Sequence, residues 1–208
     1  MTSEIAGSRV VAAVTTATDR QFLEASQRAL TRAAADLASF CEHVEHNEPN
    51  SIESAASAGD HLREIASQLS YRFEVSLAAI YAARLRDVEE KSLLRYDPAA
   101  EGDISLAGTD ALMHVGTWKE LQIGQIMHDR QFHPDVFGMS KVDQIRHYTF
   151  HVTKLAGLMV DAIEKEDWEA FRKERLADIA IFGVKIATVC NVELPCTTVD
   201  VQQVESSG

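Results

Sequence analysis

Histidines, which bind metals and carry protons near neutral pH, are concentrated in the second half of the chain. Five of the eight fall close together, at His114, His128, His133, His147 and His151. His147 and His151 are four residues apart, so on a helix their rings project from one face, as two ligands of one metal do. The spacing predicts a metal site, and the alternative is a solvated polar helix face that carries two histidines.

Asp178 is the predicted third ligand, on the last helix. It lies at the edge of that helix's apolar stripe, where an isolated charge has to be paired, hydrogen-bonded or metal-bound. The alternative is a plain ion pair with Arg175, Lys185 or Lys154. The pattern therefore leaves open whether this carboxylate binds a metal or a neighbouring cation.

Residues 128–135 are crowded with ionisable side chains, and we expect a loop from His128 to Met139. Loops on rigid helical scaffolds concentrate binding groups, so His128 and His133 are expected to assist the metal site. A divalent metal ion, whose identity the sequence leaves open, is the predicted cofactor.

Three further charged residues invite interpretation. Arg84 and Asp87 continue an apolar helical stripe, which predicts an internal ion pair or, as the alternative, contact with a ligand. Glu120 is the third residue of a capping box that starts at Thr117, so its carboxylate is expected to bond the helix start. A catalytic role for Glu120 is the alternative.

The composition bounds the class of protein. The chain has 208 residues and a formal net charge of −12, so it lacks the basic excess that binding to nucleic acid or an anionic membrane requires. Its three cysteines rule against a disulfide framework and favour a reducing compartment. A basic leader is missing, as is any run of about 18 apolar residues, so we expect a cytoplasmic protein without a membrane span.

The apolar periodicity predicts an all-α fold, a bundle of five to six helices that include long antiparallel ones. One helical domain spans 1–208, with flexible termini at 1–17 and 196–208. A second apolar stripe, Ala78, Tyr81 and Leu85, predicts a homo-oligomer. The helices are expected at 18–46, 50–94 with an interruption at Gly59, 117–127, 140–164 and 167–190, with an irregular stretch at 96–110.

Residues 139–194 resemble the helical core of the MazG-like all-α nucleotide pyrophosphohydrolases. Residues 140–159 resemble that family's first metal helix, and residues 174–182 resemble its second. The resemblance implies magnesium bound by an ExxE and an ExxD pair, and cleavage of a nucleoside triphosphate between its α and β phosphates. Here the four positions carry His151, Lys154, Arg175 and Asp178. Because magnesium prefers hard oxygen ligands, the resemblance implies either another metal, such as zinc, manganese or iron, or a metal-free pocket.

These observations lead to a hypothesis of a metal-dependent hydrolase for a nucleotide or other small phosphorylated molecule. The metal activates a bound water, while Lys154 or Arg175 neutralises developing negative charge. The first alternative is a non-enzymatic helical protein that binds a ligand or partner. The second is a His-ligated iron oxidoreductase, although the Glu-x-x-His pairs of di-iron bundles are missing.

Overall fold

The computed structural model describes residues 17–49, 51–96 and 116–200. All regular structure in this part of the chain is helical, apart from one isolated β-bridge between Thr117 and Thr198. The all-α prediction is confirmed. None of the described helices is both long and apolar enough to span a bilayer.

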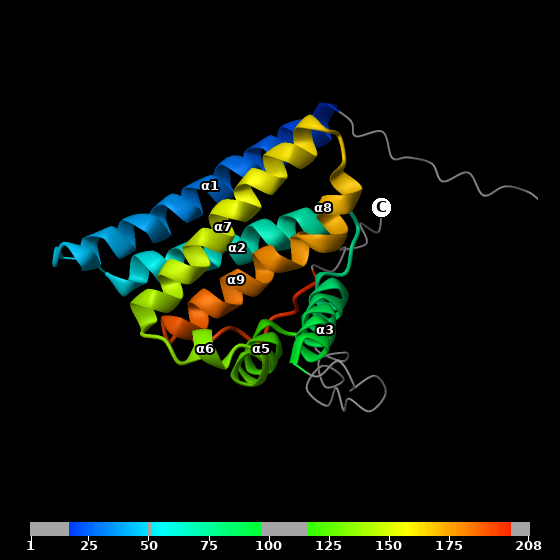
Figure 1. Cartoon of the computed structure of the whole chain (residues 1–208). Coiled ribbons are helices and arrows are strands. Elements are labelled where there is room, and N and C mark those ends of the chain that lie inside the picture. Colours follow the sequence, from blue (N-terminus) through cyan, green and yellow to red (C-terminus); the bar gives the residue numbers. More distant parts are fainter. Residues whose placement is uncertain (1–16, 50, 97–115, 201–208) are drawn as a thin grey trace, which may run out of the picture.

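The described helices are α1 (Ala17–Glu45), α2 (Ile52–Arg72), α3 (Leu77–Tyr96), α5 (Trp118–Phe132), α6 (Pro134–Phe137), α7 (Lys141–Glu164), α8 (Trp168–Glu174) and α9 (Leu176–Val189). Helices α1, α7, α2 and α9 lie side by side, and α3 and α5 cross beneath them (Figure 1). Of the upper helices, α1 packs mainly on α7, and α2 packs mainly on α9. In Figure 1 α3 and α5 are seen nearly end-on.

Side-chain caps set several helix ends as the sequence predicts. Thr117 and Glu120 form the complete capping box at the start of α5, and the Ser140 side chain caps α7. Asn191 follows α9 with a φ of 58°, the left-handed conformation expected just after a helix. Ser51 caps α2, one residue later than predicted.

Two predicted long helices are each divided. The helix expected at 50–94 breaks at residues 73–76, where Glu74 has a φ of 53°. The helix expected at 167–190 breaks at Arg175, between α8 and α9. Apolar periodicity continues through both breaks because each flanking helix also faces the core, so the pattern alone does not reveal the change of direction. The irregular stretch expected at 96–110 lies, beyond Tyr96, outside the described residues.

The loop expected at His128 to Met139 is also corrected. Residues 128–132 form the last turn of α5, and Pro134 starts the short helix α6. Proline is the first residue in this stretch that disfavours helix, and it suits the first position of a new one. His128 therefore has the fixed orientation of a helical side chain.

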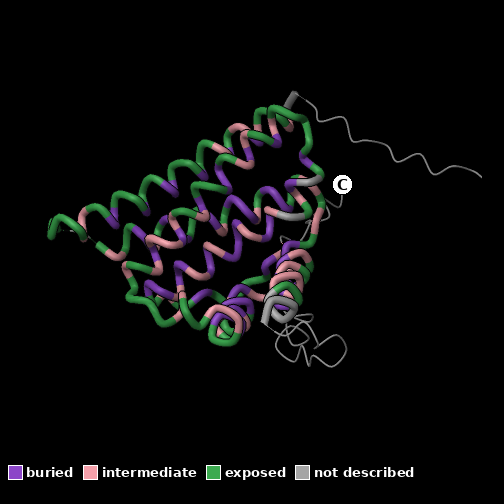
Figure 2. Tube along the Cα trace, in the orientation of Figure 1, coloured by how far each residue is buried: buried purple, intermediate pink, exposed green. Residues whose placement is uncertain are grey.

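Helix α9 is the centre of the fold, in contact with α2, α3, α5, α7 and α8. Buried residues follow its length in Figure 2. Its closest neighbour is α2: a Cβ added at Gly183 would lie 2.9 Å from the carbonyl oxygen of Gly59. Gly59 does not interrupt α2 as predicted, but lies buried within it where the two helices touch.

The segment after α9 ties the starts of two helices together. The backbone N–H of Trp118 donates to Thr197 at 3.1 Å, and Val199 donates to Gly116 at 2.8 Å. The Asp200 carboxylate accepts from the backbone N–H of Leu77 at 2.6 Å. Residues 197, 199 and 200 thus form hydrogen bonds with the rest of the fold, and the flexibility expected of the termini stays a prediction. Residues 1–16 and 201–208 lie outside the described residues.

The apolar stripe behind the oligomer prediction is covered within the chain. Tyr81 and Leu85 are buried, and Ala78 is half-buried. Homo-oligomerisation stays a prediction without the support of this stripe.

Candidate functional site

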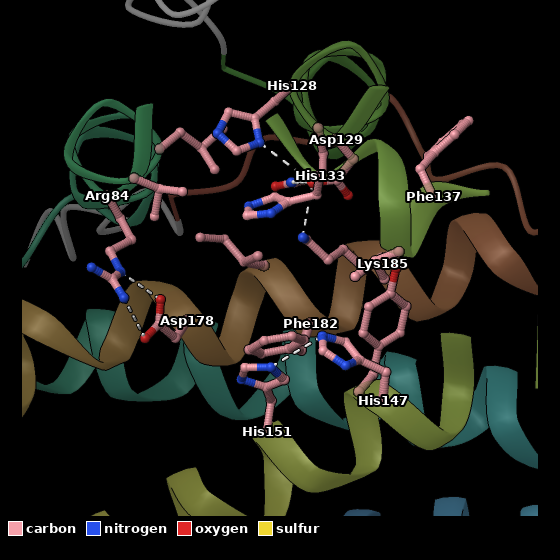
Figure 3. Close-up of a pocket in the computed structure, with 16 residues that line it drawn as sticks. Arg84, His128, Asp129, His133, Phe137, His147, His151, Asp178, Phe182 and Lys185 are labelled. Atoms are coloured by element: carbon pink, nitrogen blue, oxygen red, sulfur yellow. Dashed lines mark hydrogen bonds and ion pairs between the residues drawn. The ribbon is translucent and has the colours of Figure 1, made fainter. Parts of the chain in front are cut away.

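A cavity of about 180 Å³ opens between α3, α5, α6, α7 and α9 (Figure 3). One water needs about 10–15 Å³ of such space, so the cavity has room for an ion together with a small ligand group. The four histidines in its lining all belong to the set singled out from the sequence. The polar lining is Arg84, Gln125, His128, Asp129, His133, His147, Tyr148, His151, Asp178 and Lys185, and the apolar lining is Leu85, Val88, Val136, Phe137, Ile181 and Phe182.

The end of α5 gathers His128, Asp129 and His133. One potential ligand atom from each of them lies within 4.8 Å of the others. His128 and Asp129 are buried and His133 is half-buried. The turn before Pro134 produces this cluster, because it returns His133 toward the last helical turn.

The Asp129 carboxylate has several donors on one oxygen. Its Oδ1 lies 2.8 Å from Nζ of Lys185 and accepts from Nε2 of Gln125 at 2.9 Å. Burial acts to raise the pKa of Asp129, but the His128 hydrogen bond and the Lys185 charge outweigh it, and the pKa is lowered. Asp129 is therefore an ionised carboxylate inside the protein.

The His128 ring has one nitrogen engaged and one free of any partner in the described residues. Nδ1 lies 3.3 Å from Oδ1 of Asp129, whereas Nε2 is buried without a hydrogen-bond partner. The 3.3 Å between Nδ1 and Oδ1 is also a separation that two ligand atoms of one ion can have, whereas Nε2 points to the opposite side of the ring, away from Asp129. An unsatisfied buried nitrogen is costly, so it marks this position as a place for a ligand.

His133 is held in its neutral form. Burial, followed by the charge of Lys185, lowers its pKa to about 4. Its ring is 5.6 Å from that of His128, centroid to centroid. Near neutral pH His133 can therefore offer a ring nitrogen to a metal without first losing a proton.

His147 and His151 form the opposite wall of the cavity, on α7. Their Nε2 atoms are 3.2 Å apart, and the His151 ring stacks on Phe182 at 4.8 Å. Burial lowers the pKa of both rings, and Lys185 lowers them further. The pair is half-buried beside the cavity, which argues against the freely solvated helix face considered from the sequence. Figure 3 shows Lys185 between this pair and the His128 cluster.

Asp178 lines the cavity, but its carboxylate is paired with arginines. Arg84 donates to it from Nε at 2.7 Å and from Nη2 at 3.2 Å, and Arg175 approaches at 3.5 Å. Arg84 also binds Asp87 at 2.6 Å, the internal pair that the sequence predicts. The ion-pair alternative thus describes Asp178 as observed, with Arg84 as its main partner. Among the described residues, Asp178 forms no three-ligand cluster with His147 and His151.

The two remaining predicted catalytic residues lie outside the cavity lining. Lys154 is exposed on α7. Glu120 accepts from the Thr117 hydroxyl at 2.8 Å and from the backbone of Thr117 and Gly116, and these bonds lower its pKa. Glu120 therefore acts as the helix cap that its position predicts.

Sequence reasoning missed Asp129 and Lys185 as site residues. The uninterrupted run from Thr117 to Phe132 could have extended α5 and placed Asp129 one turn after Gln125. Lys185 had a weaker signal, a cation at the edge of an apolar helix. Its contact with Asp129 joins residues 56 positions apart, which no local pattern reveals.

Comparisons with protein-family models, with curated proteins and with solved structures find no match. The likeness of residues 139–194 to the pyrophosphohydrolases stays a prediction. The geometry of the cavity therefore carries the functional argument.

Proposed function

We propose that His128, Asp129 and His133 bind one divalent transition metal, and that the protein is a metal-dependent hydrolase of a nucleotide or other small phosphorylated molecule. The observation that carries this proposal is the convergence of the three side chains around an ionised Asp129, with one potential ligand atom of each within 4.8 Å of the others. His133 completes the set as a neutral imidazole. Two imidazoles and one carboxylate suit zinc, manganese or iron better than magnesium.

This ligand set favours catalysis over a purely structural role. Structural zinc sites use four protein ligands, whereas catalytic sites use three and keep a position for water or substrate. Bound there, the ion supplies a water of lowered pKa and polarises an oxygen of the substrate.

Residues around the cluster suit an anionic substrate. Lys185 and a bound ion would compete for Asp129, so with the ion in place the ammonium group would be available to a phosphoryl oxygen. Arg84 also lines the cavity, where it is paired with Asp178 and Asp87. The lowered pKa values of His147 and His151 leave the pair neutral near pH 7, with one hydrogen shared between the two Nε2 atoms, so the pair can take up a proton. Phe182 and Phe137 add apolar surface to the cavity lining.

Two alternatives share this site. The 2.8 Å ion pair between Lys185 and Asp129 satisfies the carboxylate without a metal and favours a metal-free ligand-binding protein. An iron oxidoreductase is the other, because two histidines and a carboxylate with open positions are also the ligand set of non-haem iron oxygenases. The metal content of the purified protein distinguishes the proposed hydrolase from the metal-free alternative. The identity of the metal, together with the activity, distinguishes it from the oxidoreductase.

The decisive experiment measures metal in the purified protein and by titration of the stripped protein with zinc, manganese and ferrous iron. We expect close to one equivalent per chain, and its loss in His128→Ala. His61→Ala is the matched control, because His61 is exposed on α2 and should leave binding intact. Hydrolysis of nucleoside triphosphates and small phosphate esters is then assayed with the loaded protein. A chain that binds none of the three metals refutes the proposal.

A further inference from the structure

A chain of buried hydrogen bonds leads from α3 to the proposed metal site. The Tyr81 hydroxyl donates to Oε1 of Gln125 at 2.6 Å, and Nε2 of Gln125 donates to Oδ1 of Asp129 at 2.9 Å. The three residues are 0%, 1% and 6% exposed, in that order. None of these polar groups therefore relies on bulk water.

We infer that Tyr81 and Gln125 are positioning residues that hold the Asp129 carboxylate in the orientation required for metal binding. The inference rests on the proposed metal site. A carboxylate ligand needs a partner that fixes its rotation, and such supporting groups strongly affect metal affinity. Gln125 precedes Asp129 by one helical turn, so its amide can reach the carboxylate within α5.

The Tyr81 hydroxyl determines which way the Gln125 amide faces. Because the hydroxyl donates to Oε1, the amide NH₂ group turns toward Asp129. Without that donor the amide can rotate and place its oxygen against the carboxylate, where two acceptors repel each other. Tyr81 thus acts on Asp129 through Gln125, without touching the cluster itself.

A second buried glutamine on the same helix shows what a structural role looks like. Gln122 donates to the backbone oxygen of Val192 at 2.8 Å and accepts from the backbone N–H of Leu194 at 2.9 Å. Its amide satisfies main-chain groups that would otherwise be buried without partners. The bonds of Gln125, in contrast, run between side chains and end at the cluster.

The bond from Gln125 gains importance when the ion binds. Lys185 and Gln125 both hold Oδ1 of Asp129 in the structure. A cation at the cluster repels the Lys185 ammonium, whereas the neutral amide of Gln125 can remain in place. The Gln125 amide, on the same helix, then holds the Asp129 carboxylate in place.

The test compares zinc affinities of the full-length protein, measured by competition with a chromophoric chelator. Gln125→Met keeps the shape of the side chain and removes both bonds, and we expect a rise in Kd of about 10- to 100-fold. Tyr81→Phe should raise Kd in the same direction by a smaller factor. The double variant should bind zinc no more weakly than Gln125→Met alone, because both changes interrupt the same chain of hydrogen bonds.

Gln122→Met is the matched control. It removes a buried glutamine from the same helix and should lower the urea midpoint of the metal-free protein while leaving the zinc Kd unchanged. An equal rise in Kd for Gln122→Met would mean that general loosening of α5 weakens binding, and would overturn the inference.

The remaining outcomes separate the two proposals. If wild type binds zinc, His128→Ala does not, and Gln125→Met binds as wild type does, the positioning role is wrong and the metal site stands. If wild type binds no zinc, manganese or iron, both fail. Should Gln125→Met not fold, Tyr81→Phe decides, since an unchanged Kd in that variant also overturns the inference.

Discussion

Replacement of Gly183 by alanine tests the packing of the central helix. Gly183→Ala adds one methyl group where α9 touches α2. That carbon would lie 2.7 Å from Cγ of Arg63, 2.9 Å from the Gly59 carbonyl oxygen and 3.1 Å from the Arg63 backbone nitrogen. The Arg63 side chain can move, but the two backbone atoms belong to α2 and move only if the helices separate.

Two opposing terms set the magnitude. Alanine favours a helix interior over glycine by about 1 kcal/mol. Overpacking of a closely packed contact costs about 1–3 kcal/mol, and contact with backbone places this case toward the upper end. The net expectation is a loss of about 1–2 kcal/mol, which for a chain of this size lowers Tm by about 2–8 °C.

Gly157→Ala provides the control, with the opposite expected sign. Gly157 is exposed within α7, and an added Cβ meets nothing within 4 Å. Its alanine variant should gain up to about 1 kcal/mol from helix preference. Urea and thermal unfolding followed by far-UV circular dichroism measure both variants. If Gly183→Ala is stabilised as Gly157→Ala is, the close contact of α2 and α9 is wrong.

Two further predictions concern the cavity. Lys185→Met removes the ion-pair partner of the buried Asp129 charge, so the unfolding free energy of the metal-free variant, measured in urea, should fall by about 3 kcal/mol. The same variant should bind zinc more tightly than wild type, because a competing cation is gone. Weaker zinc binding would contradict the competition. Burial lowers the pKa values of His147 and His151 below their ordinary 6.5, so the unfolded chain binds protons first as the pH falls and the unfolding free energy decreases below about pH 6.5. Urea unfolding across this range should show a shallower pH dependence for the His147→Gln/His151→Gln variant, and an unchanged slope would refute the assignment.

Local signals in the sequence were sufficient for much of the fold. The Thr117 capping box, the Ser140 cap and the Asn191 helix end depend on neighbouring residues, and all three occur as predicted. The breaks near Glu74 and at Arg175 were missed. The first is stabilised by Asp200, more than a hundred residues away in the sequence, whose carboxylate caps α3.

The candidate site divides in the same way. His128, His133, His147 and His151 could be singled out by residue type, and the structure places all four around one cavity. Their grouping could not be predicted, because it depends on where α5 ends and on which helices face each other. Asp178 illustrates this limit. Its main partner, Arg84, lies on α3, and the residues around Asp178 in the sequence do not reveal that α3 packs beside it.

The hydrogen bonds that join residues 197–200 to the starts of α3 and α5 have a consequence for biosynthesis. Helices α1, α2 and α7 can associate early, but the cavity needs α9 and the segment through Asp200, which leave the ribosome after the other described helices. Until then the histidines of α5 and α7 are present without the wall that carries Lys185 and Phe182. A chain interrupted before Leu176 therefore has the proposed ligand residues but lacks the α9 wall of the cavity, so in the proposed metal site the ion would bind only after α9 has been made.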